Sequence, residues 1–193
     1  MPDASPLPDL ISHVLYNEET LQRRVAELGA AISADYATKK PHLIGVLRSV
    51  IVFMADLMRS ITIPMTVDFI AISSYGPSTK GQGGVRLTKD LDQPIAGRHV
   101  IFVEDVIDTG LTLSYLLHIL KARQPASLQV CVLFNRPQRR LIDIPLAYSG
   151  FDVPDHYLVG YGLDYQQRYR NLPYVGVLKE DKVLPYRWSR GRV

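Results

Sequence analysis

The stretch 99–123 constrains the fold more than any other part of the chain. Its first five residues, mainly apolar, predict a buried strand, and the leucine-rich residues 111–123 predict a helix. A short acidic turn that contains a glycine separates the two. A strand that continues into a helix through so short a turn is the building unit of a parallel α/β sheet. We therefore expect an α/β fold, an open parallel sheet with helices on both faces.

The same alternation recurs on both sides of this stretch. Asn17 is expected to cap a helix with apolar residues every three or four positions, which should stop before Pro41. Further elements are predicted at 42–47 (strand), 50–60 (helix), 65–72 (strand) and 128–134 (strand). The later short strands, 157–159 and 174–178, predict a smaller lobe over the edge of the sheet. We expect one domain over residues 1–193, with a flexible start at 1–10.

Residues 73–84 lack helical or strand periodicity, and three of their last four residues are glycine. We expect a mobile loop here. The spacing of Gly76 and Gly81 is that of a phosphate-binding P-loop, but Gln82 and Gly83 stand where lysine and serine or threonine are required. A P-loop is therefore excluded. The motifs of dinucleotide-binding proteins, α/β-hydrolases and zinc proteases are not found either.

The turn at 104–112 carries the residues best suited to chemistry. Its end, 109–112, should present backbone N–H groups, two hydroxyls and the positive end of a helix dipole to an anion, and Gly110 lets a phosphate approach the main chain. Glu104 and Asp105 are adjacent carboxylates that need hydroxyl donors or a cation. The turn therefore predicts a monophosphate site beside a sugar diol or Mg²⁺. The competing interpretation, a capped helix with solvated acids, does not explain the apolar residues around both acids.

Composition excludes several classes of protein. Cys131 is the only cysteine, so neither an intrachain disulfide nor a cysteine-based zinc cluster can form, and a reducing compartment is expected. We see no secretory signal and no apolar run of membrane-spanning length, and we expect a cytoplasmic protein without a membrane partner. The net charge of +3 comes from a basic, acid-free tail at 182–193 and is weak evidence for a nucleic-acid-binding face.

Residues 103–112, Val-Glu-Asp-Val-Ile-Asp-Thr-Gly-Leu-Thr, resemble the phosphoribosyl-pyrophosphate motif of type I phosphoribosyltransferases. The resemblance extends to Gly-Val-Leu at 45–47, Ser-Tyr at 74–75, Lys-Asp-Leu at 89–91, Pro-Asp at 154–155 and Val-Gly-Tyr-Gly-Leu-Asp-Tyr at 159–165. Together these motifs look like those of the hypoxanthine-guanine phosphoribosyltransferases, over most of the chain. The resemblance implies the type I phosphoribosyltransferase fold, with a small hood lobe beside the sheet.

The resemblance also implies roles around the ribose and its phosphate. Glu104 and Asp105 would hold the ribose hydroxyls and the Mg²⁺ shell. Asp108 would face N7 of the purine as the catalytic general acid or base. The 5′-phosphate would be bound by Asp108, Thr109, Gly110, Leu111 and Thr112.

The remaining implied positions surround the leaving group and the base. Pyrophosphate would be bound by Leu47, Arg48, Ser49 and Arg170. A lid that carries Ser74 and Tyr75 would close over the reacting centre. The purine would be contacted by Arg136, Tyr157, Leu158 and Asp164, and Asp164 would also lie near a metal.

Four positions depart from the family's usual residues. Arg48 and Arg136 stand where a lysine is usual, and Ser49-Val50 stands where Gly-Ser is usual. Arginine keeps the charge and the donor, but it is longer and planar, so its fit to a single carbonyl differs. Ser49 replaces a glycine at a position of unusual backbone geometry. We therefore expect base preference and turnover to be the properties in which this chain differs most from the family.

The function implied by the resemblance is purine salvage. The reaction would be the Mg²⁺-dependent transfer of the phosphoribosyl group from phosphoribosyl pyrophosphate to N9 of hypoxanthine or guanine, by a homodimer or homotetramer. One alternative is a transferase that prefers xanthine or adenine, and another is a regulator of this fold that binds nucleic acid. The chain keeps Asp108 and shows neither an added helix-turn-helix nor a basic patch interleaved with aromatic residues, so we expect an enzyme without a nucleic-acid partner.

Overall fold

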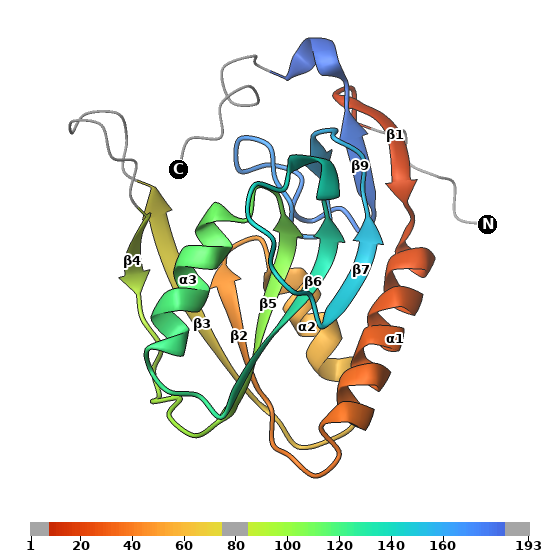
Figure 1. Ribbon diagram of the computed structural model, residues 1–193. Helices are drawn as coiled ribbons and strands as arrows, with labels where there is room; N and C mark the ends of the chain where they lie inside the picture. The colour runs from red at the N-terminus through yellow and green to blue at the C-terminus, as the bar shows by residue number, and fades with distance from the viewer. Residues whose placement is uncertain (1–7, 75–84, 184–193) are drawn as a thin grey trace, which may run out of the picture.

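The computed structural model describes residues 8–74 and 85–183, and a six-stranded sheet forms its centre (Figure 1). Its strands are β2 (His42–Leu47), β3 (Thr66–Ser74), β4 (Val85–Lys89), β5 (His99–Ile107), β6 (Ser127–Asn135) and β7 (Tyr148–Asp152). They are ordered β4-β3-β2-β5-β6-β7. All neighbouring pairs are parallel except β3 and β4. The expected parallel sheet is confirmed for five strands, whereas β4 is antiparallel to β3; the ten residues between them are fewer than the dozen or so that a parallel crossover needs.

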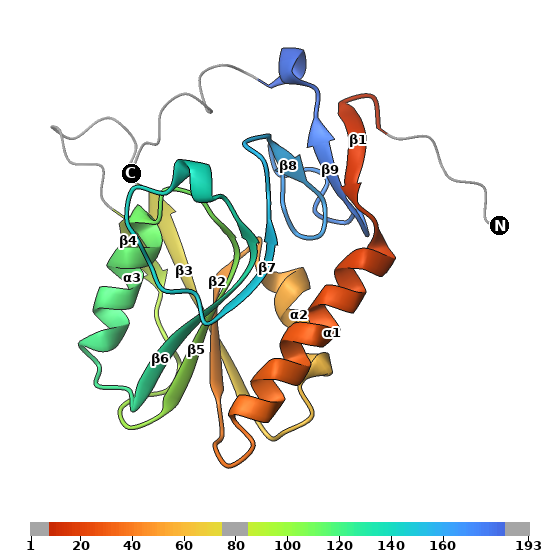
Figure 2. The ribbon, with the colours of Figure 1, turned by 45° about the vertical axis from the view of Figure 1, so that its right-hand side comes forward.

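Helices cover both faces of this sheet (Figure 2). α1 (Glu18–Asp35) and α2 (Ile51–Ser60) lie on one face, and α3 (Leu111–Lys121) lies on the other. Asn17 caps α1 as predicted, because its side chain accepts a hydrogen bond of 2.9 Å from the Thr20 backbone N–H. Apolar residues of each helix are buried against the sheet in two separate core clusters. Among the described residues, no helix is long and apolar enough to cross a membrane.

The direction in which strands are added reverses between β2 and β5. From β2 the chain continues through α2 on one face, whereas from the neighbouring β5 it continues through α3 on the other face. In open α/β sheets, ligands bind at the carboxyl ends of strands where such a reversal occurs. The residues that follow Leu47 and those that follow Ile107 both lie at this position.

A second, three-stranded sheet lies beyond the carboxyl ends of the large sheet, on the β7 side, and forms the hood (Figures 1 and 2). Its strands are β1 (Ile11–Tyr16), β9 (Val175–Leu178) and β8 (Leu158–Val159), in that order. The lobe predicted from the late segments is therefore present, but the start of the chain supplies one of its edge strands. Leu10 is also fixed there, because its carbonyl accepts a hydrogen bond from Lys179. The flexible start predicted for 1–10 stays a prediction, and residues 1–7 of it lie outside the described residues.

Two strands run at least two residues past their predicted ends. β5 was expected to end at Val103 but pairs with β6 as far as Ile107, so Glu104 and Asp105 lie within the strand. β3 continues through Ser74, which pairs with Val85 in β4. In both cases backbone hydrogen bonds to a neighbouring strand extend the ladder through polar residues, Glu104 and Asp105 in β5 and Ser73 and Ser74 in β3. The rest of the predicted mobile loop lies outside the described residues.

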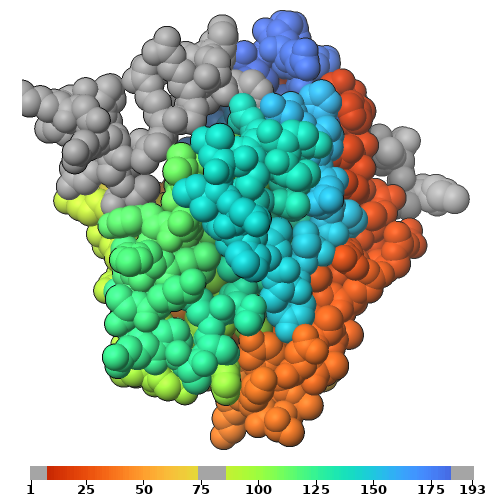
Figure 3. Space-filling model, in the orientation of Figure 1, coloured from red at the N-terminus to blue at the C-terminus, as the bar shows by residue number. Residues whose placement is uncertain are grey.

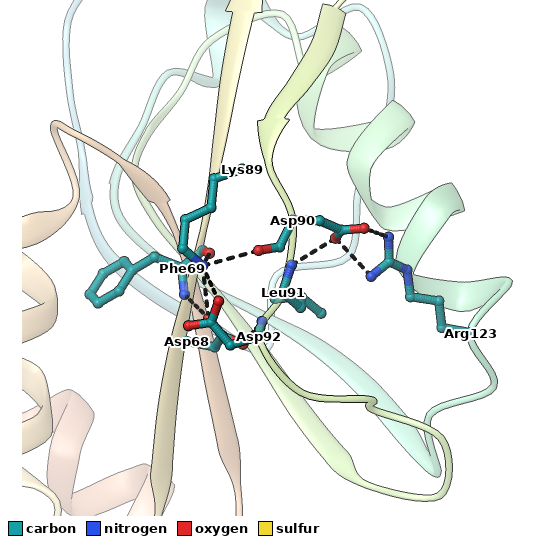
Figure 4. A network of polar contacts seen from close by, with 7 residues as sticks. All are labelled: Asp68, Phe69, Lys89, Asp90, Leu91, Asp92 and Arg123. Carbon is teal, nitrogen blue, oxygen red and sulfur yellow. Dashed lines mark hydrogen bonds and ion pairs between the residues drawn. The ribbon is translucent and has the colours of Figure 1, made fainter.

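Lys89 attaches the edge strand β4 to the sheet (Figure 4). Its ammonium donates hydrogen bonds to the carbonyls of Phe69 (2.8 Å) and Asp90 (3.0 Å) and to the Asp92 carboxylate (3.0 Å). It also lies 3.4 Å from the buried Asp68 carboxylate, which accepts hydrogen bonds from the backbone N–H groups of Phe69 and Asp92. Burial alone would raise the pKa of Asp68, but these donors lower the pKa below its ordinary value. The network therefore holds an ionised carboxylate at the sheet edge.

Candidate active site

The turn from β5 into α3 lies at the N-terminus of a helix, where backbone N–H groups can bind an anion. Gly110 precedes α3 with φ of +83°, and a Cβ there would lie 3.0 Å from the Ile142 carbonyl oxygen. The Thr109 carbonyl accepts hydrogen bonds from the backbone of Leu141 (3.0 Å) and Ile142 (3.2 Å). The segment after β6 thus covers the turn, and the space-filling view shows it beside α3 (Figure 3). In the first turn of α3, the Leu111 N–H donates a long hydrogen bond of 3.4 Å to Thr109 Oγ1, and the exposed Thr112 follows, so a phosphate can bind here by replacing that contact.

Two carboxyl groups of β5 precede this turn, one from the buried Asp105 and one from the half-buried Glu104. Burial raises the pKa of Asp105 to about 6, although the Ser49 hydroxyl hydrogen-bonds to it and the Arg170 cation is near. Burial and the neighbouring Asp105 raise the pKa of Glu104 well above its ordinary value. Glu104 Oε2 is buried without a hydrogen-bond partner among the described residues. Since unsatisfied buried acids are costly, this pair indicates a ligand that supplies a cation or hydroxyl donors.

These acids fit a magnesium ion that takes few ligands from the protein. Mg²⁺ is usually held by one or two carboxylates together with waters and substrate phosphates. Asp164, the third predicted ligand, instead pairs with Arg170 at 2.7 Å and accepts a hydrogen bond from the Gln167 backbone at 2.8 Å. Among the described residues, no three His, Cys, Asp or Glu side chains are grouped to hold a metal. A metal bound here would therefore take its other ligands from the substrate and water.

The two arginines predicted for pyrophosphate converge on one side chain. Arg48, which is exposed, donates from Nη1 to Gln167 Oε1 at 3.4 Å. Arg170 donates from Nη2 to the same oxygen at 3.2 Å and from Nη1 to the Gly162 carbonyl at 2.7 Å. The sequence did not single out Gln167, which has a left-handed backbone with φ of 65°. Both guanidinium groups donate to its amide oxygen, so an acceptor oxygen of a ligand could bind at the same position.

The loop after β2 packs directly on a turn of the hood. The peptide bond between Leu47 and Arg48 is cis. Gly162 has φ of +96°, and a Cβ there would lie 2.2 Å from the Ser49 carbonyl oxygen. Ser49 therefore links the hood backbone to the Asp105 carboxyl group, whose pKa its hydroxyl lowers.

Asp108 lies beside two arginines of the segment after β6. Arg139 donates from Nη1 to Asp108 Oδ2 at 3.1 Å, and Arg136 Nη1 lies 3.8 Å from Asp108 Oδ1. Arg136 is 6% exposed and donates from Nη2 to the His156 carbonyl at 2.8 Å. The structure therefore brings together Asp108 and Arg136, which were predicted for proton transfer and base binding. The sequence did not single out Arg139, although a position three residues after Arg136 in a short turn could have indicated that the two lie on one side.

The other predicted base contacts come from the hood. Tyr157 is half-buried; its hydroxyl donates to the Asp164 carbonyl at 3.2 Å, and its ring lies edge-on to Tyr165 at 5.3 Å. The Leu158 side chain is buried in the core, so a contact between Leu158 and a base would fall to its backbone. Of the two lid residues, Ser74 ends β3 and Tyr75 lies outside the described residues.

Comparisons with known proteins give consistent matches over most of the chain. Residues 14–166 match the phosphoribosyl transferase domain family. Hypoxanthine-guanine phosphoribosyltransferase of Streptococcus agalactiae is 50% identical over 171 residues, which cover 89% of this chain and 95% of the relative. The Bacillus subtilis protein of the same name is 47% identical over 169 residues, which cover 88% and 94%.

Solved structures show the same relationship. A hypoxanthine-guanine phosphoribosyltransferase of Bacillus anthracis, with HEPES in its active site, has a TM-score of 0.83 and 43% identity, over 88% of this chain and 99% of that one. A hypoxanthine phosphoribosyltransferase of Staphylococcus aureus has a TM-score of 0.87 and 38% identity, over 94% and 98%. The chain therefore belongs to the phosphoribosyltransferase family, as an enzyme of its hypoxanthine-guanine group.

Proposed function

We propose that this enzyme transfers the phosphoribosyl group from phosphoribosyl pyrophosphate to N9 of hypoxanthine or guanine, with Mg²⁺, and yields IMP or GMP and pyrophosphate. The observation that carries the proposal is the order of groups at the sheet edge. Glu104 and Asp105 come shortly before the turn into α3, and Asp105 lies near the Arg170 cation, which shares the Gln167 amide oxygen with Arg48. This order matches a substrate with a phosphate at one end, a diol in the middle and a diphosphate at the other end.

The substrate would be bound first through its phosphate and ribose. The N–H groups at 109–112 bind the 5′-phosphate, while Glu104 and Asp105 accept hydrogen bonds from the ribose hydroxyls and hold Mg²⁺. When bound, Mg²⁺ would neutralise charge on the pyrophosphate as it leaves. The Ser49 hydroxyl holds the Asp105 carboxyl group in place.

The reaction then needs charge stabilisation at the leaving group and a proton acceptor at the base. Arg48 and Arg170 stabilise the negative charge that develops on pyrophosphate. Asp108 takes the proton from the purine ring as N9 attacks the ribose C1′. The Arg136 guanidinium donates a hydrogen bond to the 6-oxo group, and the Tyr157 ring packs against the base.

A turnover screen tests this proposal. Hypoxanthine, guanine, xanthine and adenine would each be incubated with phosphoribosyl pyrophosphate, with Mg²⁺ or with excess EDTA. We expect turnover of hypoxanthine and guanine only, because adenine presents a 6-amino donor to the Arg136 donor, and we expect its loss in EDTA. Preference for xanthine or adenine would overturn the assigned base, and equal turnover in EDTA would overturn the role of Mg²⁺. A chain that turns over none of the four bases would refute the proposed reaction.

A further inference from the structure

Arg139 joins two carboxylates that come from different parts of the fold. Its Nη1 donates to Asp108 Oδ2 at 3.1 Å, and its Nε lies 3.0 Å from Asp155 Oδ1. Asp108 follows β5, whereas Asp155 lies directly before the hood strand β8. The Arg139 side chain is 24% exposed, so solvent screens these contacts only in part. Next to this bridge, Arg136 donates to the carbonyl of His156.

We propose that Arg139 is a positioning residue for the transfer reaction, an inference that rests on the proposed role of Asp108. Arg139 occupies one oxygen of Asp108 and so fixes the plane of the carboxylate. The other oxygen, Oδ1, accepts no hydrogen bond among the described residues and lies 3.8 Å from Arg136 Nη1, and this is the oxygen left to receive the purine proton. A planar guanidinium suits this task, because its donors have fixed directions toward two acceptors.

The same bridge sets the distance between the proton acceptor and the base-binding part of the hood. Asp155 is two residues before Tyr157, whose ring we propose packs against the purine. The Arg139 side chain thus connects the Asp108 carboxylate, which takes the proton, to the segment that holds the base. Proton transfer requires a donor and an acceptor within hydrogen-bond reach. Loss of the Arg139 contacts should therefore lower kcat more than it weakens substrate binding.

A kinetic double-mutant cycle tests this inference. We expect Arg139→Gln to lower kcat by about 10- to 100-fold while the KM for phosphoribosyl pyrophosphate stays within about threefold of wild type. If Arg139 acts through Asp108, then the double variant Asp108→Asn/Arg139→Gln should have a kcat less than about threefold below that of Asp108→Asn alone. Arg139→Lys, which keeps the charge and can reach one carboxylate, should recover part of kcat. If Arg139→Gln does not fold, as judged by thermal unfolding, Arg139→Lys serves in both backgrounds.

Arg123→Gln is the matched control, because it removes the same charge from an arginine that pairs with Asp90 in the β4 network (Figure 4). We expect wild-type kinetics from this variant. Losses from Arg139→Gln and Asp108→Asn that multiply, or an unchanged kcat in Arg139→Gln, would overturn the positioning role. A wild-type protein that turns over no base would instead refute the proposed function. An active wild type that is unaffected by Asp108→Asn would refute the role of Asp108, and with it the inference.

Discussion

Replacing Gly162 with alanine tests whether the hood holds the loop after β2 in place. Gly162 has φ of +96°, and a Cβ there would lie 2.2 Å from the Ser49 carbonyl oxygen and 3.6 Å from Val52 Cβ. Ordinary contact begins near 3.4 Å, so the two backbones must separate by about 1 Å. The loop that would move carries Arg48 and Ser49, which we propose bind pyrophosphate and hold Asp105.

The size of the effect follows from two separate costs. An L-residue in the left-handed region loses about 1–2 kcal/mol of folding free energy. A displacement of about 1 Å in a substrate-positioning loop costs about 100-fold in catalysis. We therefore expect Gly162→Ala to lower kcat/KM for phosphoribosyl pyrophosphate by about 10- to 100-fold, in addition to the loss of stability.

Gly97→Ala separates the two costs. Gly97 also has a positive φ, +71°, but a Cβ there would meet no atom within 4 Å. This control should lose about 1–2 kcal/mol of stability in urea unfolding and keep wild-type kinetics. Both variants would be assayed at varied concentrations of phosphoribosyl pyrophosphate. Wild-type kcat/KM in a folded Gly162→Ala protein would refute the argument that contact with the hood positions the loop.

Three further predictions concern single side chains. Asp108→Asn should lower kcat by about 10²- to 10⁴-fold with little change in the KM for phosphoribosyl pyrophosphate, because an amide cannot take the purine proton; a loss below about threefold would remove Asp108 from proton transfer. Lys89→Met should lower the free energy of unfolding by about 1–3 kcal/mol, because the buried Asp68 carboxylate loses its cation; an unchanged urea midpoint would show that backbone donors are sufficient. Burial, helped by the Arg98 cation, lowers the pKa of His42 below 6.5, so the unfolded chain takes up a proton more readily and stability should fall as the pH drops below about 6.5. His42→Gln should flatten that fall in unfolding experiments, and the exposed His13 supplies the control His13→Gln; parallel stability curves for all three proteins would contradict it.

The β5–α3 unit could be predicted from sequence because its evidence is local. An apolar strand, a glycine-containing turn and a leucine-rich helix follow one another within 25 residues, so 99–123 specifies its own structure. The hood could not be predicted as fully. β1 pairs with β9, from the other end of the chain, and three of its six residues are exposed, so its sequence carries no clear apolar alternation. Nothing local indicates such a distant pairing.

The candidate site also has a part that is local in the sequence and a part that only the fold brings together. The phosphate turn and its acids form one continuous motif, and the sequence was sufficient to single them out. The sequence did not single out Arg139 or Gln167, because the importance of each depends on the residues it contacts. Arg139 contacts Asp108 and Asp155. Gln167 contacts Arg48 and Arg170. An arginine or a glutamine in a polar segment is by itself most simply explained as a solvated side chain. Only the fold brings these partners together.

The two arginines that stand where the family usually has lysine both form links to the hood. Arg136 donates to the His156 carbonyl while its other terminal nitrogen lies 3.8 Å from Asp108, and Arg48 donates to Gln167, which also accepts from Arg170. A lysine ammonium is a compact point charge without a fixed fork, so it would not reproduce both contacts of Arg136 in the same geometry. Each arginine therefore joins the end of a strand in the large sheet to the hood, one on the side of the base and one on the side of pyrophosphate. If base preference and pyrophosphate affinity differ in this enzyme from those of its relatives, the two differences have a common structural origin in the position of the hood.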